Sequence, residues 1–227
     1  MSNLLFDPIK TQSRVTDSVI VAFSGGKDSI VTLDLCSRYF KKIYSFFMYL
    51  VPNLEFQERM LRWYENKYNV NIIRIPHFET SELLKYGSFT LPDYDMNIVN
   101  INDVYEYMRQ ITGAFWIAAG ERAKDSIIRN AMIKNSGSID EKRGRFYPIA
   151  WWNKTQVLSY IKVKHLYLSS EQRKMEFSFK SLSGSELSVI KNLYPDDYKK
   201  ILKVYPFAEA AVIHYEKFEI GDVDGKK

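Results

Sequence analysis

One segment near the N-terminus constrains the fold of this chain more than any other. Residues 19–29 read Val-Ile-Val-Ala-Phe-Ser-Gly-Gly-Lys-Asp-Ser, and residues 30–40 follow with the spacing of a helix. The apolar, partly β-branched start predicts a strand buried on both faces, and the two glycines allow a sharp turn close to a ligand. A strand, a glycine-rich turn and a helix N-terminus form an anion site, because free backbone N–H groups and the helix dipole face the ligand. With Lys27 adding a positive charge, the predicted ligand is a phosphate.

Two common phosphate-binding motifs do not fit this loop. A Walker loop needs Gly-x-x-x-x-Gly-Lys-Ser/Thr, but Val21 stands where its first glycine would be, and Asp28 replaces the magnesium-binding hydroxyl. A dinucleotide fingerprint needs Gly-x-Gly-x-x-Gly, and the loop has only two adjacent glycines. The segment instead resembles the PP-loop of the ATP pyrophosphatase (adenine nucleotide α-hydrolase-like) superfamily, whose signature is Ser-Gly-Gly-x-Asp-Ser after the first strand.

Further strands and helices alternate along the chain. Apolar patterns predict three more strands, at 43–51, 70–75 and 114–119, and a helix at 55–68 between the first two of these. This βαβαβ order predicts an α/β fold, in which a doubly wound, Rossmann-like parallel sheet carries helices on both faces.

The composition also suggests how the chain is divided. We expect a nucleotide-binding domain over 1–165 and a mainly helical C-terminal extension over 166–227, in which Ser185 caps a helix. Within the first domain, 79–110 is expected to be an irregular insertion with short helices. It is acidic, because 79–106 contains six Asp/Glu and one lysine.

A second cluster follows the last predicted strand, where residues 120–129 read Gly-Glu-Arg-Ala-Lys-Asp-Ser-Ile-Ile-Arg. Ligands of a doubly wound sheet bind beyond the carboxyl ends of its strands, so this cluster is expected beside the glycine-rich loop. Arg122 offers planar, bidentate donors to a phosphate or sulfate. Asp125 is placed to orient that arginine or to help hold a magnesium ion, and Arg129 lies about one helical turn further. A plain basic surface turn is the alternative interpretation.

The pattern Gly-x-Arg-x-x-Asp-Ser-x-x-Arg in this cluster is similar to one in the phosphoadenosine phosphosulfate (PAPS) reductase-like branch of the PP-loop superfamily. Pro-Ile-Ala-Trp-Trp at 148–152 resembles a second motif of that branch. The resemblance covers roughly 17–165. It implies binding of ATP or another adenine nucleotide with Mg²⁺, attack of an acceptor on the α-phosphorus, and release of pyrophosphate. Positioning and electrostatics would carry most of such catalysis.

The resemblance, together with the residue types, assigns roles to individual positions. The catalytic groups would be Lys27, Asp28 and Arg122. The phosphate-binding set would be Ser24, Gly25, Gly26, Lys27, Asp28, Ser29, Arg122 and Arg129. Adenine is expected against the edge of the second strand, read mainly by backbone groups around Phe47, Met48 and Tyr49. The metal would lie near Asp28 and Asp125.

The single cysteine limits the chemistry. Reductases of the resembled branch need a cysteine near the C-terminus, and none follows Cys36. One cysteine cannot form a disulfide framework or a structural zinc or iron–sulfur site within the chain, and its place in a helix favours a buried packing residue. The leading hypothesis is therefore an enzyme of redox-free adenylyl transfer or α–β phosphate cleavage, with an unidentified acceptor. A non-catalytic nucleotide-binding module that acts with a protein partner is the alternative.

Composition and charge add a third hypothesis. A hydrophobic content of 46% argues for an ordered chain, and no apolar stretch has membrane-spanning length. With no signal-peptide pattern, we expect a cytoplasmic protein without membrane contact. Residues 122–180 hold thirteen Lys/Arg and five Asp/Glu with interleaved aromatics. They could bind nucleic acid or an acidic protein surface, as in a nucleic-acid modification component. A phosphate funnel and a solvated surface are the plainer interpretations.

Overall fold

The computed structural model describes residues 3–170, 174 and 178–219 of the 227-residue chain. The chain forms two compact units, each assembled from segments that are far apart in sequence. The first unit consists of Met1–Phe47, Leu61–Ile75 and Asn102–Tyr167, and the second of Met48–Met60, Pro76–Ile101 and Leu168–Lys227. Compact units need not coincide with domains, and the division expected at residue 165 stays a prediction.

The described strands form one mostly parallel, six-stranded sheet in the order β3-β2-β1-β4-β6-β5. Its strands are β1 (Ser18–Ala22), β2 (Lys42–Tyr49), β3 (Ile72–Pro76), β4 (Ile117–Ala118), β5 (Ile139–Asp140) and β6 (Arg145–Phe146). β1 pairs in parallel with β2 and β4, β4 pairs in parallel with β6, and β5 runs antiparallel to β6. The predicted doubly wound α/β fold is confirmed, although the fourth strand is much shorter than the predicted run of 114–119.

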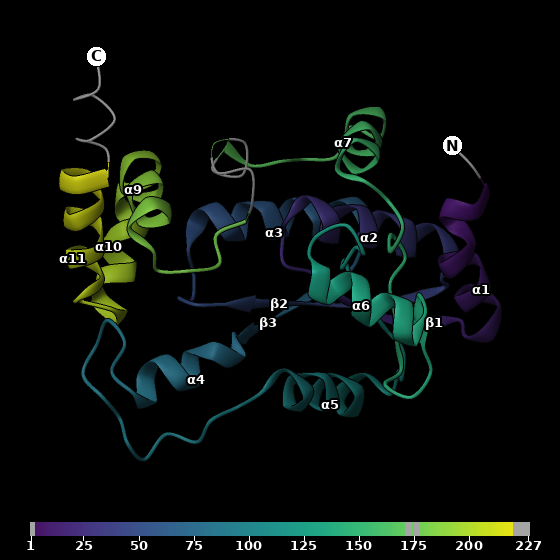
Figure 1. The fold of residues 1–227 in the computed structure, drawn as a ribbon, viewed down its shortest axis with the longest axis horizontal. Coiled ribbons are helices and arrows are strands. Elements are labelled where there is room, and N and C mark those ends of the chain that lie inside the picture. The colour runs from purple at the N-terminus through teal and green to yellow at the C-terminus, as the bar shows by residue number, and fades with distance from the viewer. Residues whose placement is uncertain (1–2, 171–173, 175–177, 220–227) are drawn as a thin grey trace. The chain divides into compact units, whose positions relative to one another are not determined.

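Helices flank this sheet on both faces. In the first unit, α2 lies on one face and α5 on the other (Figure 1). The helices are η1 (Asn3–Phe6), α1 (Asp7–Val15), α2 (Lys27–Tyr39), α3 (Glu55–Tyr68), α4 (Phe78–Lys85), α5 (Ile101–Thr112), α6 (Ile127–Ser136), α7 (Lys154–Val163), α9 (Gly184–Leu193), α10 (Pro195–Val204), α11 (Ala208–His214) and η2 (Tyr215–Glu219). None of the described helices combines the length and the apolar character that crossing a bilayer requires.

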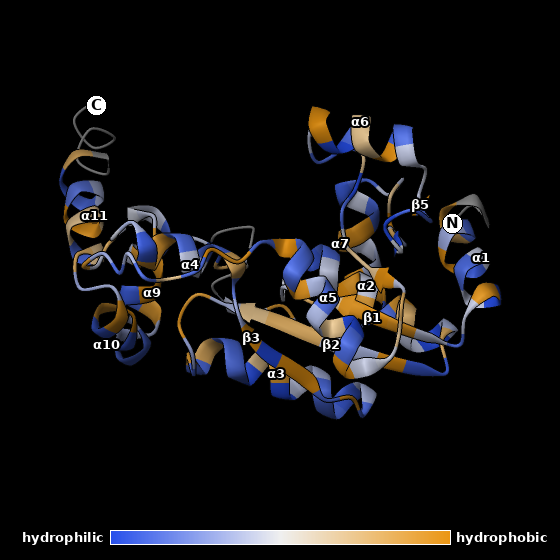
Figure 2. Ribbon diagram, turned by 90° about the horizontal axis from the view of Figure 1, so that it is seen from below, coloured by the Kyte–Doolittle hydropathy of each residue, from blue (hydrophilic) through white to orange (hydrophobic). Residues whose placement is uncertain are grey.

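β1 lies at the centre of the sheet because its middle residues are apolar on both faces. Val19, Ile20 and Val21 are completely buried, and Figure 2 shows the central strands in hydrophobic colours. Cys36 on α2 is also buried, as expected for a packing residue, and burial raises the pKa of its thiol. A reactive thiolate is therefore disfavoured at this position.

A buried carboxylate, Asp34, links three helices of the first unit. Its Oδ1 accepts hydrogen bonds from Tyr68 Oη on α3 (2.7 Å) and Arg38 Nη2 (3.1 Å), and its Oδ2 accepts from Arg38 Nε and from Tyr160 Oη on α7 (both 2.7 Å). Burial opposes ionisation of Asp34, but the hydrogen bonds from Arg38, Tyr160 and Tyr68 hold its pKa below the usual value. These contacts fix α2 against its neighbours.

Two buried carboxylates organise the second unit. Asp197 on α10 accepts a hydrogen bond from the backbone N–H of Phe56 at 3.0 Å. This N–H lies in the first turn of α3 and has no acceptor within that helix, so a residue 141 positions further along the chain supplies one. Glu186 accepts from the N–H groups of Lys180 and Ser181, at 2.9 and 3.2 Å. The cap of α9 is Ser183, whose Oγ accepts from the Glu186 N–H; the prediction of Ser185 as the cap was wrong.

Candidate phosphate site at the start of α2

The glycine-rich loop after β1 is folded by the hydroxyl groups of its two serines. Ser29 Oγ donates to the Gly26 carbonyl at 2.9 Å and accepts from the backbone N–H and Oγ of Ser24, both at 3.2 Å. Ser24 Oγ in turn accepts from the Gly26 N–H at 3.4 Å. Gly25, at φ +73°, takes a left-handed conformation that a side chain would strain. Protein groups alone therefore hold this loop in shape.

The helix that follows the loop begins without a side-chain cap. α2 starts at Lys27 with Gly26 as its N-cap and, like α1, α10 and α11, has no side-chain cap. Side chains of Ser126, Asn153 and Ser183 cap α6, α7 and α9. The first N–H groups of a helix have no acceptor within the helix. At the start of α2 they and the positive end of the helix dipole are therefore suited to an anion.

Gly120, two residues after the end of β4, lies close to the backbone at the start of α2. A Cβ at Gly120 would lie 3.0 Å from the Ser29 nitrogen and 3.1 Å from the Asp28 carbonyl carbon. Both atoms belong to the backbone of α2, which cannot yield as a flexible side chain can. A side chain at position 120 would therefore require the backbone at the start of α2 to shift by a few tenths of an ångström. Gly120 was not among the predicted site residues.

Arg122 forms an ionic link between the loop and the segment after β4. Its Nε lies 2.9 Å from Asp28 Oδ1, and its Nη2 lies 2.5 Å from Asp125 Oδ1. Asp125 Oδ2 accepts from the Arg122 N–H at 3.0 Å and from Arg129 Nη1 at 3.4 Å. The Arg122 side chain is only 7% exposed. Asp125 thus orients Arg122, and Lys27 Nζ, 3.0 Å from Asp28 Oδ2, adds a second cation.

Unsatisfied polar atoms are concentrated around this link. Of seven buried side-chain N and O atoms that lack a hydrogen bond in the described residues, five belong to Asp28, Glu121, Arg122, Asn130 and Arg145. Asp28 Oδ1 and Arg122 Nε make an ion pair, but their N–H···O geometry is not that of a hydrogen bond. Buried polar atoms without a hydrogen bond are few in native proteins. The side chains of Glu121 and Asn130, close in sequence to Arg122, each contribute one such atom.

Glu121 is a residue of this region that the sequence did not single out as functional. Its Oε2 is one of the unsatisfied atoms. Burial raises the pKa of its carboxyl, although the charges of Arg129 and Arg145 oppose the shift. The sequence feature that could have indicated Glu121 is its position directly before Arg122, just after a predicted strand, because ligands of α/β sheets bind beyond the strand ends.

The carboxylates of both predicted magnesium ligands are paired with cationic side chains. Asp28 Oδ1 lies 2.9 Å from Arg122 Nε, and Asp28 Oδ2 accepts a hydrogen bond from Lys27 Nζ at 3.0 Å. Both oxygens of Asp125 already accept hydrogen bonds from Arg122 or Arg129. No group of three or more His, Cys, Asp or Glu in the described part of the chain could hold a metal. Mg²⁺ commonly binds one or two carboxylates together with substrate phosphates. Asp28 would enter that arrangement by exchanging its contact with Lys27 or Arg122 for the metal ion.

The residues predicted to contact adenine lie at the end of β2. Phe47 is buried, whereas Met48 and Tyr49 are partly exposed. The Tyr49 carbonyl accepts the His77 N–H at 2.8 Å. An adenine site at these three positions stays a prediction.

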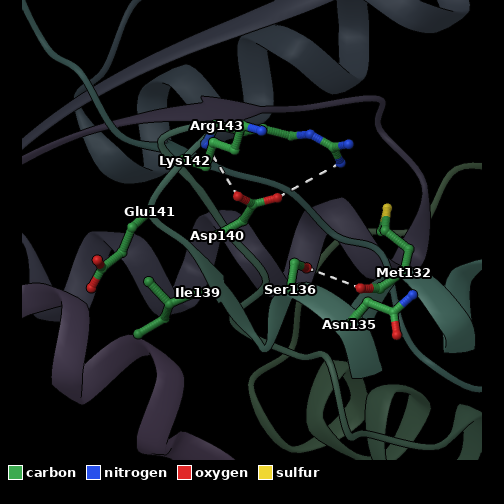
Figure 3. Close-up of a pocket in the computed structure, with 8 residues that line it drawn as sticks. All are labelled: Met132, Asn135, Ser136, Ile139, Asp140, Glu141, Lys142 and Arg143. Atoms are coloured by element: carbon green, nitrogen blue, oxygen red, sulfur yellow. Dashed lines mark hydrogen bonds and ion pairs between the residues drawn. The ribbon is translucent and has the colours of Figure 1, made fainter.

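The described structure also has an open pocket of about 660 Å³ that contains none of the predicted site residues. It lies at the end of α6 and the β5 turn (Figure 3), and it is lined by Met132, Asn135, Ser136, Ile139, Asp140, Glu141, Lys142 and Arg143. Arg143 Nη1 lies 3.7 Å from Asp140 Oδ2, and Ser136 Oγ donates to the Met132 carbonyl. These polar groups are satisfied within the protein, so the pocket is a weaker candidate than the loop.

The chain resembles one known protein family in sequence and several solved structures in fold. The sequence matches the phosphoadenosine phosphosulfate reductase domain over residues 18–170. No curated protein matches the chain in sequence. Among solved structures, a PAPS reductase from Candida auris in a phosphate complex is 16% identical, with a TM-score of 0.50 over 78% of this chain and 86% of that one.

Two further solved structures are similar in fold. A U34-tRNA thiolase from Methanococcus maripaludis with its [4Fe-4S] cluster is 13% identical, with a TM-score of 0.47 over 89% of this chain and 78% of that one. An NH3-dependent NAD synthetase from Campylobacter jejuni is 15% identical, with a TM-score of 0.47 over 99% and 94%.

Proposed function

Because the chain belongs to the phosphoadenosine phosphosulfate reductase domain family, we propose that it binds an adenine nucleotide with the phosphates at the start of α2. The observation that carries this proposal is the uncapped N-terminus of α2, behind a loop that its own serines hold in shape. The position of Arg122, which pairs with Asp28 in the first turn of α2, supports the same location. Lys27 and Arg122 supply the positive charge that polyphosphate requires.

The chemistry we propose is adenylyl transfer, or cleavage between the α- and β-phosphates of ATP, with release of pyrophosphate. The loop amides and Lys27 bind and orient the phosphates, and Arg122, held by Asp125, faces the charge that accumulates on them. Asp28 would hold Mg²⁺, which shares the negative charge of the phosphates when bound. The acceptor that attacks the α-phosphorus is unidentified.

Thiol-dependent sulfate reduction is not part of the proposal. The one cysteine, Cys36, is completely buried in α2, and burial raises the pKa of its thiol, which disfavours the nucleophilic thiolate. No cysteine follows it in the sequence. The sequence therefore has no cysteine after position 36 whose thiol could attack sulfur.

A thermal-shift comparison of ATP, ADP, AMP and PAPS, each with and without Mg²⁺, tests the proposed site. A nucleotide at 100 times its dissociation constant should stabilise the chain by about 2.7 kcal/mol. Lys27→Ala should remove most of that shift, while Lys162→Ala, which removes an exposed lysine of α7, should leave it intact. No shift with any nucleotide would contradict the proposal.

A non-catalytic nucleotide-binding module is the second candidate function. The observation that favours it is the pairing of Arg122 with two carboxylates, which already balance its charge. Measuring pyrophosphate release separates the two functions. Catalysis predicts release by the wild type that disappears in Lys27→Ala. Tight ATP binding without release for any acceptor would favour the module.

We do not extend the proposal to nucleic acid. Most aromatics interleaved with the basic residues of 122–180 are buried and cannot stack on bases: Phe146, Tyr147, Trp152, Tyr160 and Phe179. One further aromatic of that set, Phe177, lies outside the described residues. Arg122, Arg129 and Arg143 form ion pairs with neighbouring carboxylates.

A further inference from the structure

The start of α6 presents an apolar surface that its own unit leaves uncovered. Ile127 and Ile128 are 89% and 82% exposed, more than any other large apolar residue described. They give one end of α6 its strongly hydrophobic colour in Figure 2. Lys124 and Arg129, both exposed, flank them, and the Arg129 guanidinium also pairs with Asp125 at 3.4 Å. We call these four residues the α6 patch; it is apolar and basic.

A second exposed apolar surface lies in the irregular segment after α4. Five of the seventeen exposed large apolar residues described fall within 86–99: Tyr86, Leu91, Tyr94, Ile98 and Val99. Asp93 and Asp95, also exposed, lie among them. We call these seven residues the 86–99 patch; it is apolar and acidic.

The 86–99 patch is held in place although it contains no helix or strand. The Asp93 N–H donates to the Leu84 carbonyl at 2.9 Å, and the Val99 N–H donates to Ser81 Oγ at 2.9 Å. Lys85 Nζ donates to the carbonyls of Tyr94 and Met96, at 3.3 and 2.8 Å. The one lysine of this acidic region therefore fixes the backbone behind the patch. A fixed surface loses less conformational entropy on binding than a mobile loop does.

We propose that the α6 patch of one copy of this chain binds the 86–99 patch of a second copy. Clustered exposed apolar residues typically mark interaction surfaces, and these two patches carry opposite charges, which favours their association over contact of either patch with itself. Because each copy contributes a different surface, the contact is heterologous. It joins copies head to tail into a ring or an open chain.

Sedimentation velocity of the full chain over a range of concentrations tests this contact. We expect wild-type association that weakens as salt rises, since complementary charges are screened. Ile128→Glu should weaken it at least tenfold. An acidic side chain at the second position of α6 suits the helix dipole, so this variant should remain folded. Leu91→Lys should weaken association equally, whereas Val163→Glu, on the exposed end of α7, should not.

Mixing the two defective variants gives the decisive result. An equimolar mixture of the Ile128→Glu and Leu91→Lys chains retains one intact α6 patch and one intact 86–99 patch, so dimers should reappear. A mixture of the Ile128→Glu chain with an Ile127→Glu chain, which are both defective in the α6 patch, should remain dissociated. The proposal is overturned if the wild type is monomeric at all concentrations, if only one substitution weakens association, or if mixing restores nothing.

Discussion

Asp34 offers the sharpest test of how the first unit is held together. Its carboxylate is completely buried and accepts four hydrogen bonds, two at each oxygen. Asp34→Asn keeps the shape but removes the charge and turns one acceptor oxygen into an NH2 group. Two of the four donors then lose their acceptor. Hydrogen bonds to a charged group contribute roughly 1.5–3 kcal/mol each, and after partial rearrangement we expect a loss of about 3 kcal/mol in the free energy of unfolding.

Tryptophan fluorescence during urea unfolding measures this loss, because all four tryptophans belong to the first unit. Tyr160→Phe removes one donor and should cost about 1–2 kcal/mol. Asp17→Asn is the matched control, since Asp17 is 67% exposed in its pair with Lys41 and should change the midpoint little. A single hydrogen bond contributes about 1 kcal/mol. A smaller loss in the free energy of unfolding for Asp34→Asn would therefore refute the assignment of Asp34 as the link between helices.

The pH dependence gives an independent check. The folded pKa of Asp34 lies below its unfolded value, which is about 3.9 in model peptides. The contribution of Asp34 is therefore fully present above that value and is lost as pH falls through the folded pKa. The difference in stability between wild type and Asp34→Asn should be largest near neutral pH and shrink below about pH 4. A difference that stays constant from pH 7 to pH 3 would contradict this reasoning.

Three further substitutions test the site and the second unit. Gly120→Ala should lower nucleotide affinity, measured by titration calorimetry, because its Cβ would press on the Asp28–Ser29 backbone; unchanged affinity would show that the loop tolerates displacement. Ser29→Ala removes the hydroxyl that joins both sides of the loop and should weaken ATP binding about tenfold, or 1.4 kcal/mol; an equal loss of overall stability would indicate a purely structural role. Gly184→Ala would place a Cβ 2.2 Å from the Ala211 carbonyl oxygen and should destabilise the second unit by about 1–3 kcal/mol. Circular dichroism should report that loss before tryptophan fluorescence does.

Local sequence patterns predicted those structural features whose contacts are made between residues close in sequence. The buried strand β1, the turn at Gly25 and the helix after it follow from apolar runs and glycine conformations within a dozen positions. Asn153 and Gln156 have the spacing of a capping box, and the structure shows this reciprocal arrangement at the start of α7. Each of these features is decided by contacts only a few residues apart.

Features that depend on distant residues were not predictable in the same way. Asp34 meets Tyr160 across 126 positions, and nothing in the local pattern indicates which tyrosine a buried carboxylate will find. Gly120 needs to be small only because α2 approaches it in space. The proximity of Arg122 to the loop followed from the rule for strand ends, but its pairing with two carboxylates required the structure.

The bond from the Phe56 N–H to Asp197 has a consequence for the order in which the chain is made. During synthesis, α3 leaves the ribosome long before α10, so its first turn lacks that partner until nearly the whole chain has been translated. Domains generally fold as units while the chain is synthesised from its N-terminus, but the second unit cannot be completed until its last segment arrives. A nascent chain stalled before residue 197 should therefore leave the apolar residues around Phe56 accessible to chaperones, even where β1 and α2 have already formed.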